Sequence, residues 1–428
     1  MPAISESQNS NPWFQSARYG LFVHFGLYSK IGHGEWAMNK ENITLESLRQ
    51  ISSDFDPVRF DADAIADLAA AGGMKYIVFT TMHHEGFRMY HSELSDFCST
   101  KTRAGRDFTG EIICAAQKRG LKIGLYHSLN NWFDQPDAVS ALESKADYDT
   151  FISNTHARIR ELVERYKPID MFWYDGWWPF NAKGWKAEQM NAMVREIQPG
   201  IVVNGRNGLP GDFATPEQHM SAPTPWRPWE ACVTLNDNWG YHSGDNNWKS
   251  PVNVIKLLAK AAQGCGNLLL NIGPRGDGSI PEESENVIRT VGQWMQTSGD
   301  CIRETDRWSF DMYSRGAHRG DFCHHGPFTV KGNSLYLIAT SLPKDQLVLS
   351  GLEGECRAVH CLGYGPVDFA ADCGKVYVET TGLPRHLDAP PVLRFDCDRP
   401  PAIYKTGGLR VPNCEHPRYD PVESDIVW

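Results

Sequence analysis

Polar side chains follow five short apolar runs of the sequence, each at the point where the run ends. These side chains are His24, the pair His83 and His84, Tyr126 with His127, Asp175 and Arg206. If the runs are parallel strands of one β/α barrel, their carboxyl ends meet on one face, where such folds hold their active sites. The spacing therefore predicts a single pocket that contains imidazoles, a phenol, a carboxylate and a guanidinium.

Asp175 is the member of this set best suited to catalysis. It ends the aromatic run 171–174 and is followed by Gly176, Trp177 and Trp178, so its carboxylate would be partly desolvated between aromatic rings. The alternative is a strand-end aspartate that only caps the next loop, which is a common use of this residue. The polar groups at the neighbouring strand ends favour the catalytic interpretation.

A second carboxylate is required if this pocket cleaves glycosidic bonds. One carboxylate attacks or assists at the anomeric carbon, and the other protonates the leaving oxygen. The candidates for the second role are Glu35, on the loop after the first strand, Glu217 and Glu230. Each of the three is alternatively an ordinary loop or surface carboxylate.

The histidines invite a metal-site interpretation, which the spacing does not favour. His83 and His84 are adjacent, and adjacent side chains of a strand point to opposite faces, so the pair is a poor chelate. The chain has no HExxH motif and no GxSxG motif. We therefore predict no metal ligands and no cofactor, and expect the histidines to hydrogen-bond substrate hydroxyls; the alternative is that they are core or capping histidines.

Composition limits the partners of the protein. The formal net charge is −10, which argues against nucleic acid and anionic membranes and suits a neutral substrate. No run approaches the ~20 apolar residues of a membrane span, and residues 1–11 are polar, so we expect no signal peptide and a cytoplasmic location. The 14 Trp and 15 Tyr residues either stack on sugar rings or fill a large core.

The eleven cysteines bear on the redox compartment. They form no CxxC pair; five lie before residue 302 and six lie between Cys323 and Cys414. We expect reduced thiols, and the alternative for an exported protein is a set of disulfides among the last six.

Apolar runs alternate with helical patterns between about residues 15 and 300. We expect strands at 22–25, 75–81, 121–126, 169–174, 201–203 and 267–272, and helices at 61–71, 108–119, 148–166, 185–197, 253–263 and 283–297. This alternation predicts an α/β fold, and the number of units favours an irregular (β/α)8 barrel of the TIM type whose sixth and eighth strands are not evident. The alternative, a doubly wound sheet, requires a glycine-rich phosphate turn after the first strand, and residues 24–28 lack one.

The pattern changes after about residue 310, where helical spacing ends. Short alternating runs at 335–338, 347–349, 375–378 and 392–395 are separated by Gly, Pro and Asp. Such runs predict an all-β module, which we expect to be a sandwich. We therefore divide the chain into a catalytic barrel domain, 1–310, and a C-terminal β-sandwich domain, 311–428.

A series of motifs runs in order between residues 13 and 305. They include ARYGLFVHFGLY at 17–28, GEW at 34–36, TMHHEGF at 81–87, FWYDG at 172–176, NGR at 204–206, GDFATPE at 211–217 and GNLLLNIGP at 266–274. Together they resemble the α-L-fucosidases of glycoside hydrolase family 29. The C-terminal part resembles that family's β-sandwich only in general character.

The resemblance implies a retaining exo-α-L-fucosidase that acts on fucosylated glycans by double displacement. Asp175 falls on the family's nucleophile, and Glu217 falls on the acid/base position of several members, with Glu35 and Glu230 as alternatives. The residues expected to bind the sugar are His24, Glu35, Trp36, His83, His84, Tyr126, Arg206, Trp177 and Glu230.

The C5 methyl group of fucose would face an apolar wall, for which Trp36, Phe25 and Trp177 are the candidates. His127 departs from the family, because many members carry tyrosine there, so we expect a different pocket rim. The competing functions are a catalytically inactive fucose-binding protein and a metal-dependent hydrolase. Beyond the glycan we expect no nucleic-acid or membrane partner, and a homo-oligomer remains open.

Overall fold

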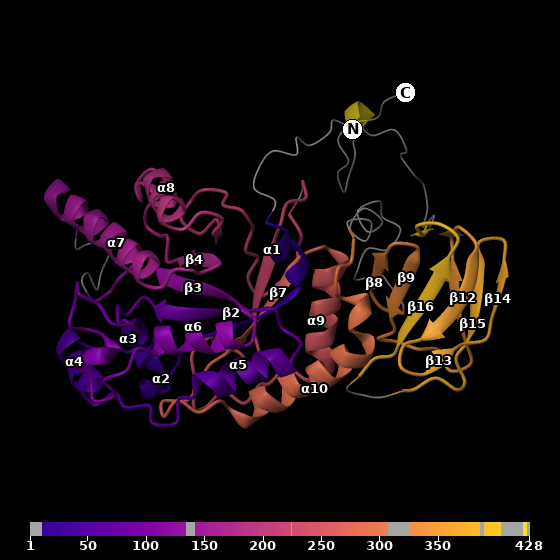
Figure 1. Ribbon diagram of the computed structural model, residues 1–428, viewed down its shortest axis with the longest axis horizontal. Coiled ribbons are helices and arrows are strands. Elements are labelled where there is room, and N and C mark those ends of the chain that lie inside the picture. Colours follow the sequence, from indigo (N-terminus) through magenta and orange to yellow (C-terminus); the bar gives the residue numbers. More distant parts are fainter. Residues whose placement is uncertain are drawn as a thin grey trace.

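The computed structural model describes residues 11–133, 142–223, 225–306, 325–385, 389–403 and 423–425. Figure 1 shows a body of parallel strands and helices at one end and a set of antiparallel strands, orange to yellow, at the other. The predicted domain boundary at residue 310 lies outside the described residues. Within the described ranges, no helix is long and apolar enough to cross a bilayer.

Seven parallel strands form the sheet of the N-terminal part. They are β1 Tyr19–Val23, β2 Tyr76–Met82, β3 Lys122–Ser128, β4 Met171–Asp175, β5 Val202–Val203, β6 Glu230–Thr234 and β7 Asn267–Ile272. Their order in the sheet is β5-β4-β3-β2-β1-β7-β6. Nearly every residue of β1, β2, β4 and β7 is buried, as is typical of parallel strands that are covered on both faces.

A short irregular segment joins the two edge strands, β5 and β6. Three isolated parallel bridges connect this segment to residues at the two edges: Asn204–Phe213, Ala214–Trp229 and Glu217–Cys232. These single bridges place residues 213–217 between the edges, at the sixth position of a TIM-like barrel. Pro216 within the segment has no N–H to give to a regular ladder, which explains why no strand is evident there in the sequence.

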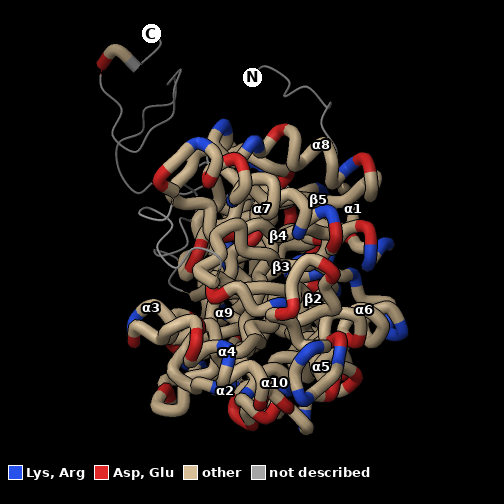
Figure 2. Tube along the Cα trace, turned by 90° about the vertical axis from the view of Figure 1, so that its left-hand side faces the viewer, with Lys and Arg blue, Asp and Glu red and all other residues tan. Residues whose placement is uncertain are grey.

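The helices of this part are α1 Pro12–Ala17, α2 Leu27–Ile31, α3 Ala37–Lys40, α4 Leu45–Ser53, α5 Ala62–Ala71, α6 Phe108–Lys118, α7 Lys145–Arg165, α8 Ala187–Ile197, α9 Pro251–Gln263 and α10 Glu282–Ser298. Most of them cover the outside of the barrel (Figure 1), whereas Phe14 of α1 packs on Phe213 and belongs to the buried cluster inside the strands. Side-chain caps begin four of them: Thr44 accepts from the Ser47 N–H, Asp61 accepts from the Ala64 N–H, Asp107 accepts from the Gly110 N–H, and Ser144 forms a capping box at α7. Acidic and basic residues are interspersed along the chain in Figure 2.

The C-terminal part consists of antiparallel sheets. Its strands are β8 Phe328–Lys331, β9 Ser334–Ile338, β10 Gln346–Ser350, β11 Leu352–Glu353, β12 Cys356–Cys361, β13 Gly365–Pro366, β14 Phe369–Asp372, β15 Lys375–Glu379, β16 Val392–Cys397 and β17 Ala402–Ile403. A five-stranded sheet, β13-β12-β16-β9-β8, and a three-stranded sheet, β10-β15-β14, are accompanied by the pair β11-β17. Leu337 and Phe395 of the first sheet share one buried cluster with Leu347 and Val378 of the second.

The two parts pack directly on each other. The indole N–H of Trp294 in α10 donates to the carbonyl of Pro390 at 2.9 Å, and the hydroxyl of Thr329 in β8 donates to the carbonyl of Cys301 at 2.6 Å. Ile338 and Val392 belong to the same buried cluster as the outer barrel residues. The C-terminal sheets therefore support the barrel from the side of α10.

Candidate active site

Asp175 is the last residue of β4, at the carboxyl end of the barrel, and its side chain is 13% exposed. Its oxygen Oδ1 lies 3.0 Å from Nη1 of Arg206. Its oxygen Oδ2 accepts a 2.8 Å hydrogen bond from the Tyr126 hydroxyl, and Nε2 of His84 lies 4.0 Å from the same oxygen. The structure thus brings together four of the groups predicted from the strand ends.

The surroundings of Asp175 keep its carboxyl group ionised. Burial acts to raise its pKa. The Arg206 guanidinium, His84 and the Tyr126 hydroxyl act in the opposite direction and together outweigh burial, so the pKa of Asp175 lies below its ordinary value. The carboxylate is therefore both desolvated and charged, which suits a nucleophile in a retaining mechanism.

Arg206 connects Asp175 with the predicted acid/base. Its Nη2 lies 2.7 Å from Oε2 of Glu217, and its Nε donates to the Thr215 hydroxyl at 3.1 Å. The guanidinium also lies over the ring of Trp173, 4.8 Å from the centroid. One guanidinium therefore contacts both carboxylates, and Glu217, with 41% of its side chain exposed, is the one open to solvent.

Glu230 does not join this group, contrary to its prediction as a sugar ligand or alternative acid. It is the first residue of β6 and pairs with Asn267, the first residue of β7, so it lies at the opposite end of the strands from Asp175. Its fully buried carboxyl group accepts hydrogen bonds from the Tyr76 hydroxyl at 2.5 Å and from the Trp173 indole at 2.9 Å. Burial raises its pKa to about 7 despite these donors, and its contacts support the floor beneath Trp173.

The three predicted histidines form one contact group beside Asp175. His83 lies 4.0 Å from His84 and 5.9 Å from His24 between ring centroids, and its ring is parallel to that of Tyr126. Burial lowers the pKa of His24 to about 3, that of His84 to about 4, and that of His83 well below its ordinary value. All three imidazoles are therefore neutral at pH 7 and can exchange hydrogen bonds with hydroxyl groups.

Hydrogen bonds fix the proton on two of these rings. Nδ1 of His24 lies 2.6 Å from Oδ1 of Asn271, whose amide group donates to the Trp239 carbonyl. Nδ1 of His84 lies 2.7 Å from the Ser128 hydroxyl, which itself donates to the Asn130 carbonyl. Because both partners accept from the ring, each of these Nδ1 atoms carries the proton and each Nε2 is an acceptor.

Glu35 and Trp36 reach the same region from the loop after α2. The buried Glu35 carboxyl group accepts from the Gly240 N–H at 2.9 Å, and burial raises its pKa. Trp36 packs edge-on against His84 and Trp132 and stacks on Trp178. These contacts make Trp36 part of an aromatic wall that continues outward from His84.

The other two residues proposed for an apolar wall differ from each other. The ring of Trp177 is 47% exposed, and its backbone carbonyl accepts from the Trp185 indole. Phe25 is completely buried and packs on Phe60 and Phe108 in the core. Phe25 therefore supports the fold and lines no opening.

Sequence reasoning missed several residues that shape the site. They are Ser128, Trp132, Trp239, Trp173 and Glu85. Ser128 was recognisable in principle, because it ends β3 and pairs in register with Asp175. Trp132 and Trp239 were not, because their roles depend on loops that converge only in the folded chain.

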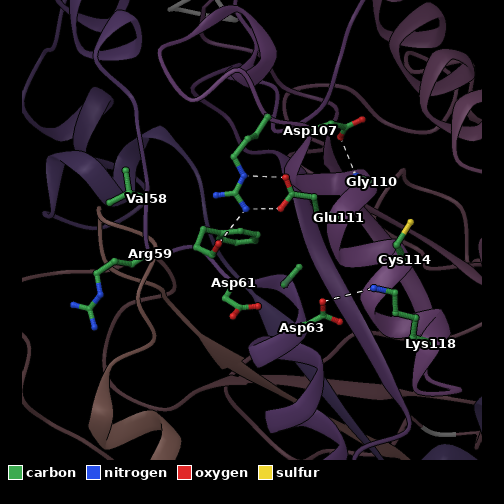
Figure 3. A pocket seen from close by; sticks show the side chains of 12 residues that line it. Val58, Arg59, Asp61, Asp63, Asp107, Gly110, Glu111, Cys114 and Lys118 are labelled. Atoms are coloured by element: carbon green, nitrogen blue, oxygen red, sulfur yellow. Dashed lines mark hydrogen bonds and ion pairs between the residues drawn. The ribbon is translucent and has the colours of Figure 1, made fainter.

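A separate hollow of about 940 Å³ lies between the N-terminal ends of α5 and α6 (Figure 3). Its charges are paired with one another: Arg106 with Glu111, and Lys118 with Asp63. None of its lining residues contacts Asp175, so the candidate site depends on the chemistry of the strand ends and not on the size of this hollow.

Comparisons with known proteins agree with the geometry. A family profile described as alpha-L-fucosidase matches residues 3–300. The tissue alpha-L-fucosidase of Rattus norvegicus is 32% identical over 329 residues, 69% of this chain and 70% of the relative.

The structure of alpha-L-fucosidase isoenzyme 1 from Paenibacillus thiaminolyticus is similar with a TM-score of 0.81 and 31% identity, covering 90% of this chain and 98% of that one. A trapped covalent intermediate of a GH29 alpha-L-fucosidase from Bacteroides thetaiotaomicron, formed with 2-fluoro-fucosyl fluoride, gives a TM-score of 0.78 at 26% identity over 90% and 94% of the chains.

Proposed function

The chain belongs to the α-L-fucosidase family, and from this premise we propose that it is a retaining glycosidase that removes terminal α-L-fucosyl groups from glycans. The observation that carries the proposal is the ionised, desolvated carboxylate of Asp175, held at the barrel mouth by Arg206 and Tyr126. A covalent intermediate trapped in a structurally similar fucosidase supports the same reaction course.

In the first step, an Asp175 oxygen attacks the anomeric carbon of the fucosyl group while Glu217 transfers its proton to the glycosidic oxygen. The bond between that oxygen and the anomeric carbon breaks, and an ester between the sugar and Asp175 forms. In the second step, Glu217 takes a proton from water, the water oxygen attacks the anomeric carbon, and Asp175 leaves as carboxylate. Two inversions restore the original anomeric configuration.

Arg206 places a condition on this cycle. Oε2 of Glu217 accepts from the Arg206 guanidinium, yet Glu217 must give a proton to the glycosidic oxygen when the substrate reacts. We therefore expect the 2.7 Å contact between Arg206 and Glu217 to open when a sugar enters, while the contact between Arg206 and Asp175 is kept. The solvent exposure of Glu217 makes it the partner that is free to move.

Substrate recognition rests on the neutral imidazoles and the aromatic wall. His24 and His84 present acceptor nitrogens, and the buried Glu35 carboxyl group offers a further polar contact for sugar hydroxyls. Trp36 offers the apolar face against which the C5 methyl group of fucose would lie.

Our expectations about the domains, the partners and the location of the protein are proposals. We propose a two-domain chain, with the barrel at 1–310 and the sheets at 311–428 forming a β-sandwich, and we retain the expectation of no nucleic-acid partner. We also propose a reducing, cytoplasmic location, which is supported by free thiols such as those of Cys98, Cys301 and Cys361 among the described residues.

The direct test is turnover of 4-nitrophenyl α-L-fucoside followed by proton NMR. The first product is expected to be α-L-fucose, which then mutarotates, and Asp175→Ala should abolish turnover while azide restores it with formation of the β-fucosyl azide. A first product of β configuration would exclude the retaining mechanism. Binding of fucose without turnover would support an inactive fucose-binding protein, and activity lost to a chelator and restored by a metal would support a metal-dependent hydrolase.

A further inference from the structure

Glu85 is a buried carboxyl group that the proposed reaction does not use. It lies in the turn after β2, two residues beyond His83, and its side chain is 2% exposed. Within the described residues, neither of its oxygens has a hydrogen-bond partner. A carboxyl group without partners in a buried site is unfavourable to the fold, so its presence calls for a role.

The atom that faces Glu85 also lacks a partner. Nδ1 of His83 is buried without a hydrogen bond among the described residues, and it lies 3.7 Å from Oε2 of Glu85. This separation is just beyond a hydrogen bond. Catalytic hydrogen bonds in ligand-free sites are often long and shorten when the substrate binds.

Comparison with the neighbouring histidines shows what is missing. His24 and His84 each have a polar side chain on Nδ1, namely Asn271 and Ser128. His83 stacks on Tyr126 and touches His84, so its ring position is fixed, but no close hydrogen bond decides which nitrogen carries its proton. Glu85 stands in the place that Asn271 and Ser128 occupy for the other two rings.

We infer that Glu85 is a positioning residue for His83, whose tautomer it fixes by bonding Nδ1 when the sugar occupies the pocket; this inference rests on the proposed function. A protonated Glu85 donates to Nδ1, so the proton of His83 lies on Nε2, which becomes a donor to a sugar hydroxyl. His24 and His84 present acceptor nitrogens, so His83 supplies the opposite hydrogen-bonding role within the same pocket.

The electrostatic surroundings agree with this assignment. Burial raises the pKa of Glu85 to about 8, and Glu35 contributes in the same direction, so the acid is neutral at pH 7. The other titratable groups near the pair are Tyr28, Tyr126, His24 and His84. Burial raises the pKa of the two tyrosines well above the ordinary value and lowers the pKa of the two histidines to about 3 and about 4, so these four keep one charge state between pH 6 and pH 9.

Two substitutions separate positioning from packing. Glu85→Leu removes the donor and replaces a buried acid by an apolar group of similar size, so the protein should stay folded. Its KM for an α-L-fucoside and its Kd for fucose should rise about tenfold or more through the lost hydrogen bond, with a smaller change in kcat. Glu85→Gln keeps an N–H donor for Nδ1 and should restore both constants to within roughly threefold of the parent.

The pH profile provides a second measurement. The parent should lose affinity for fucose as pH rises through about 8, whereas E85Q should show no such loss because an amide does not ionise. An E85L variant with the parent's KM and Kd would overturn the inference, and so would equal losses in E85L and E85Q. A parent protein that binds fucose but does not turn over the fucoside would instead refute the proposed function; the tautomer of His83, read from long-range proton–nitrogen NMR of fucose-bound parent and E85L, would then still test the pairing.

Discussion

Nη1 of Arg206 lies 3.0 Å from Oδ1 of Asp175, and this contact decides the charge of the nucleophile. Burial acts to raise the pKa of Asp175, and the guanidinium is the largest opposing influence. Without the cation, the desolvated carboxyl group would hold its proton to a higher pH. Arg206 therefore contributes to catalysis by keeping Asp175 ionised, in addition to any contact with the sugar.

The first prediction follows from this contact. Arg206→Gln removes the charge, so the pKa of Asp175 should rise and the acid limb of the kcat/KM profile should move to higher pH. Activity should therefore fall further at pH 5 than at pH 7. Arg206→Lys keeps the charge and should leave the limb near its original position, although it loses the paired geometry. An acid limb unchanged in R206Q would contradict this role.

Glu217 is predicted to be the acid/base, and its removal should depend on the leaving group. For Glu217→Ala, kcat/KM should fall roughly 10²–10⁴-fold on glycans, whose leaving oxygen needs a proton, but much less on 2,4-dinitrophenyl α-L-fucoside. Azide should restore activity and give a fucosyl azide of retained configuration. Glu35→Ala serves as the comparison, because loss of a binding group should lower activity similarly for both leaving groups. The opposite pattern would transfer the acid/base role to Glu35.

The buried carboxyl group of Glu230 is predicted to lower the free energy of unfolding as the pH rises. Its folded-state pKa is raised to about 7, so the unfolded chain loses this proton at lower pH than the folded chain does. Stability therefore falls as pH rises from about 4.5 to 7, and the cost is fully present above pH 7. Glu230→Gln should gain roughly 1–3 kcal/mol relative to the parent between pH 5 and pH 8, seen as a growing difference in Tm.

A control for that measurement is available on the surface. Glu353 in β11 is exposed, so the difference in Tm between Glu353→Gln and the parent should be small and the same at pH 5 and at pH 8. A difference for E230Q that does not change with pH would mean that the carboxyl group is already ionised at pH 5, with Tyr76 and Trp173 as its two donors.

Local patterns predicted most of the barrel, and the failures share one cause. Strands β3 and β4 have continuous apolar runs, so both strands and the chemistry near their ends were recognisable, although β3 continues past the predicted end at Tyr126 to Ser128. The segment 213–217 was not, because it pairs through single bridges and contains a proline. Strand β6 was also missed, although Glu230–Thr234 is completely buried, because its sequence EACVT begins and ends with polar residues and gives no apolar run like those of β1 and β4.

The error at Glu230 follows directly from the missed strand. A carboxylate at the beginning of a parallel strand lies at the opposite end of the barrel from one at its end, and without β6 the two cases cannot be told apart. Glu217 was one of three candidate acids proposed from the sequence, and the family resemblance favoured it; its contact with Arg206 was not foreseen, since its position depends on how 213–217 folds back. The role of Glu85 depends on a contact with His83 in the turn after β2, which sequence spacing does not encode.

Gly176, directly after Asp175, is predicted to be indispensable for the shape of the site. Its φ is +65°, and a Cβ there would lie 2.6 Å from Oγ of Ser128 and 3.1 Å from Cε1 of His84. Gly176→Ala should therefore disturb the 2.7 Å hydrogen bond between these two residues and reduce both stability and kcat/KM. Gly120 is a matched control, because its φ is +67° but no atom lies within 4 Å of a Cβ there.

Gly120→Ala should then measure the backbone strain alone, about 1–2 kcal/mol, with kcat/KM unchanged. Gly176→Ala should cost more than this in chemical unfolding, by roughly 1–3 kcal/mol for the added overlap, and should lower kcat/KM at least tenfold because His84 lies beside Asp175. Equal losses of stability in the two variants, with activity kept in G176A, would show that the turn after β4 can relax without moving His84. In that case the position of the nucleophile would depend on Arg206 and Tyr126 alone.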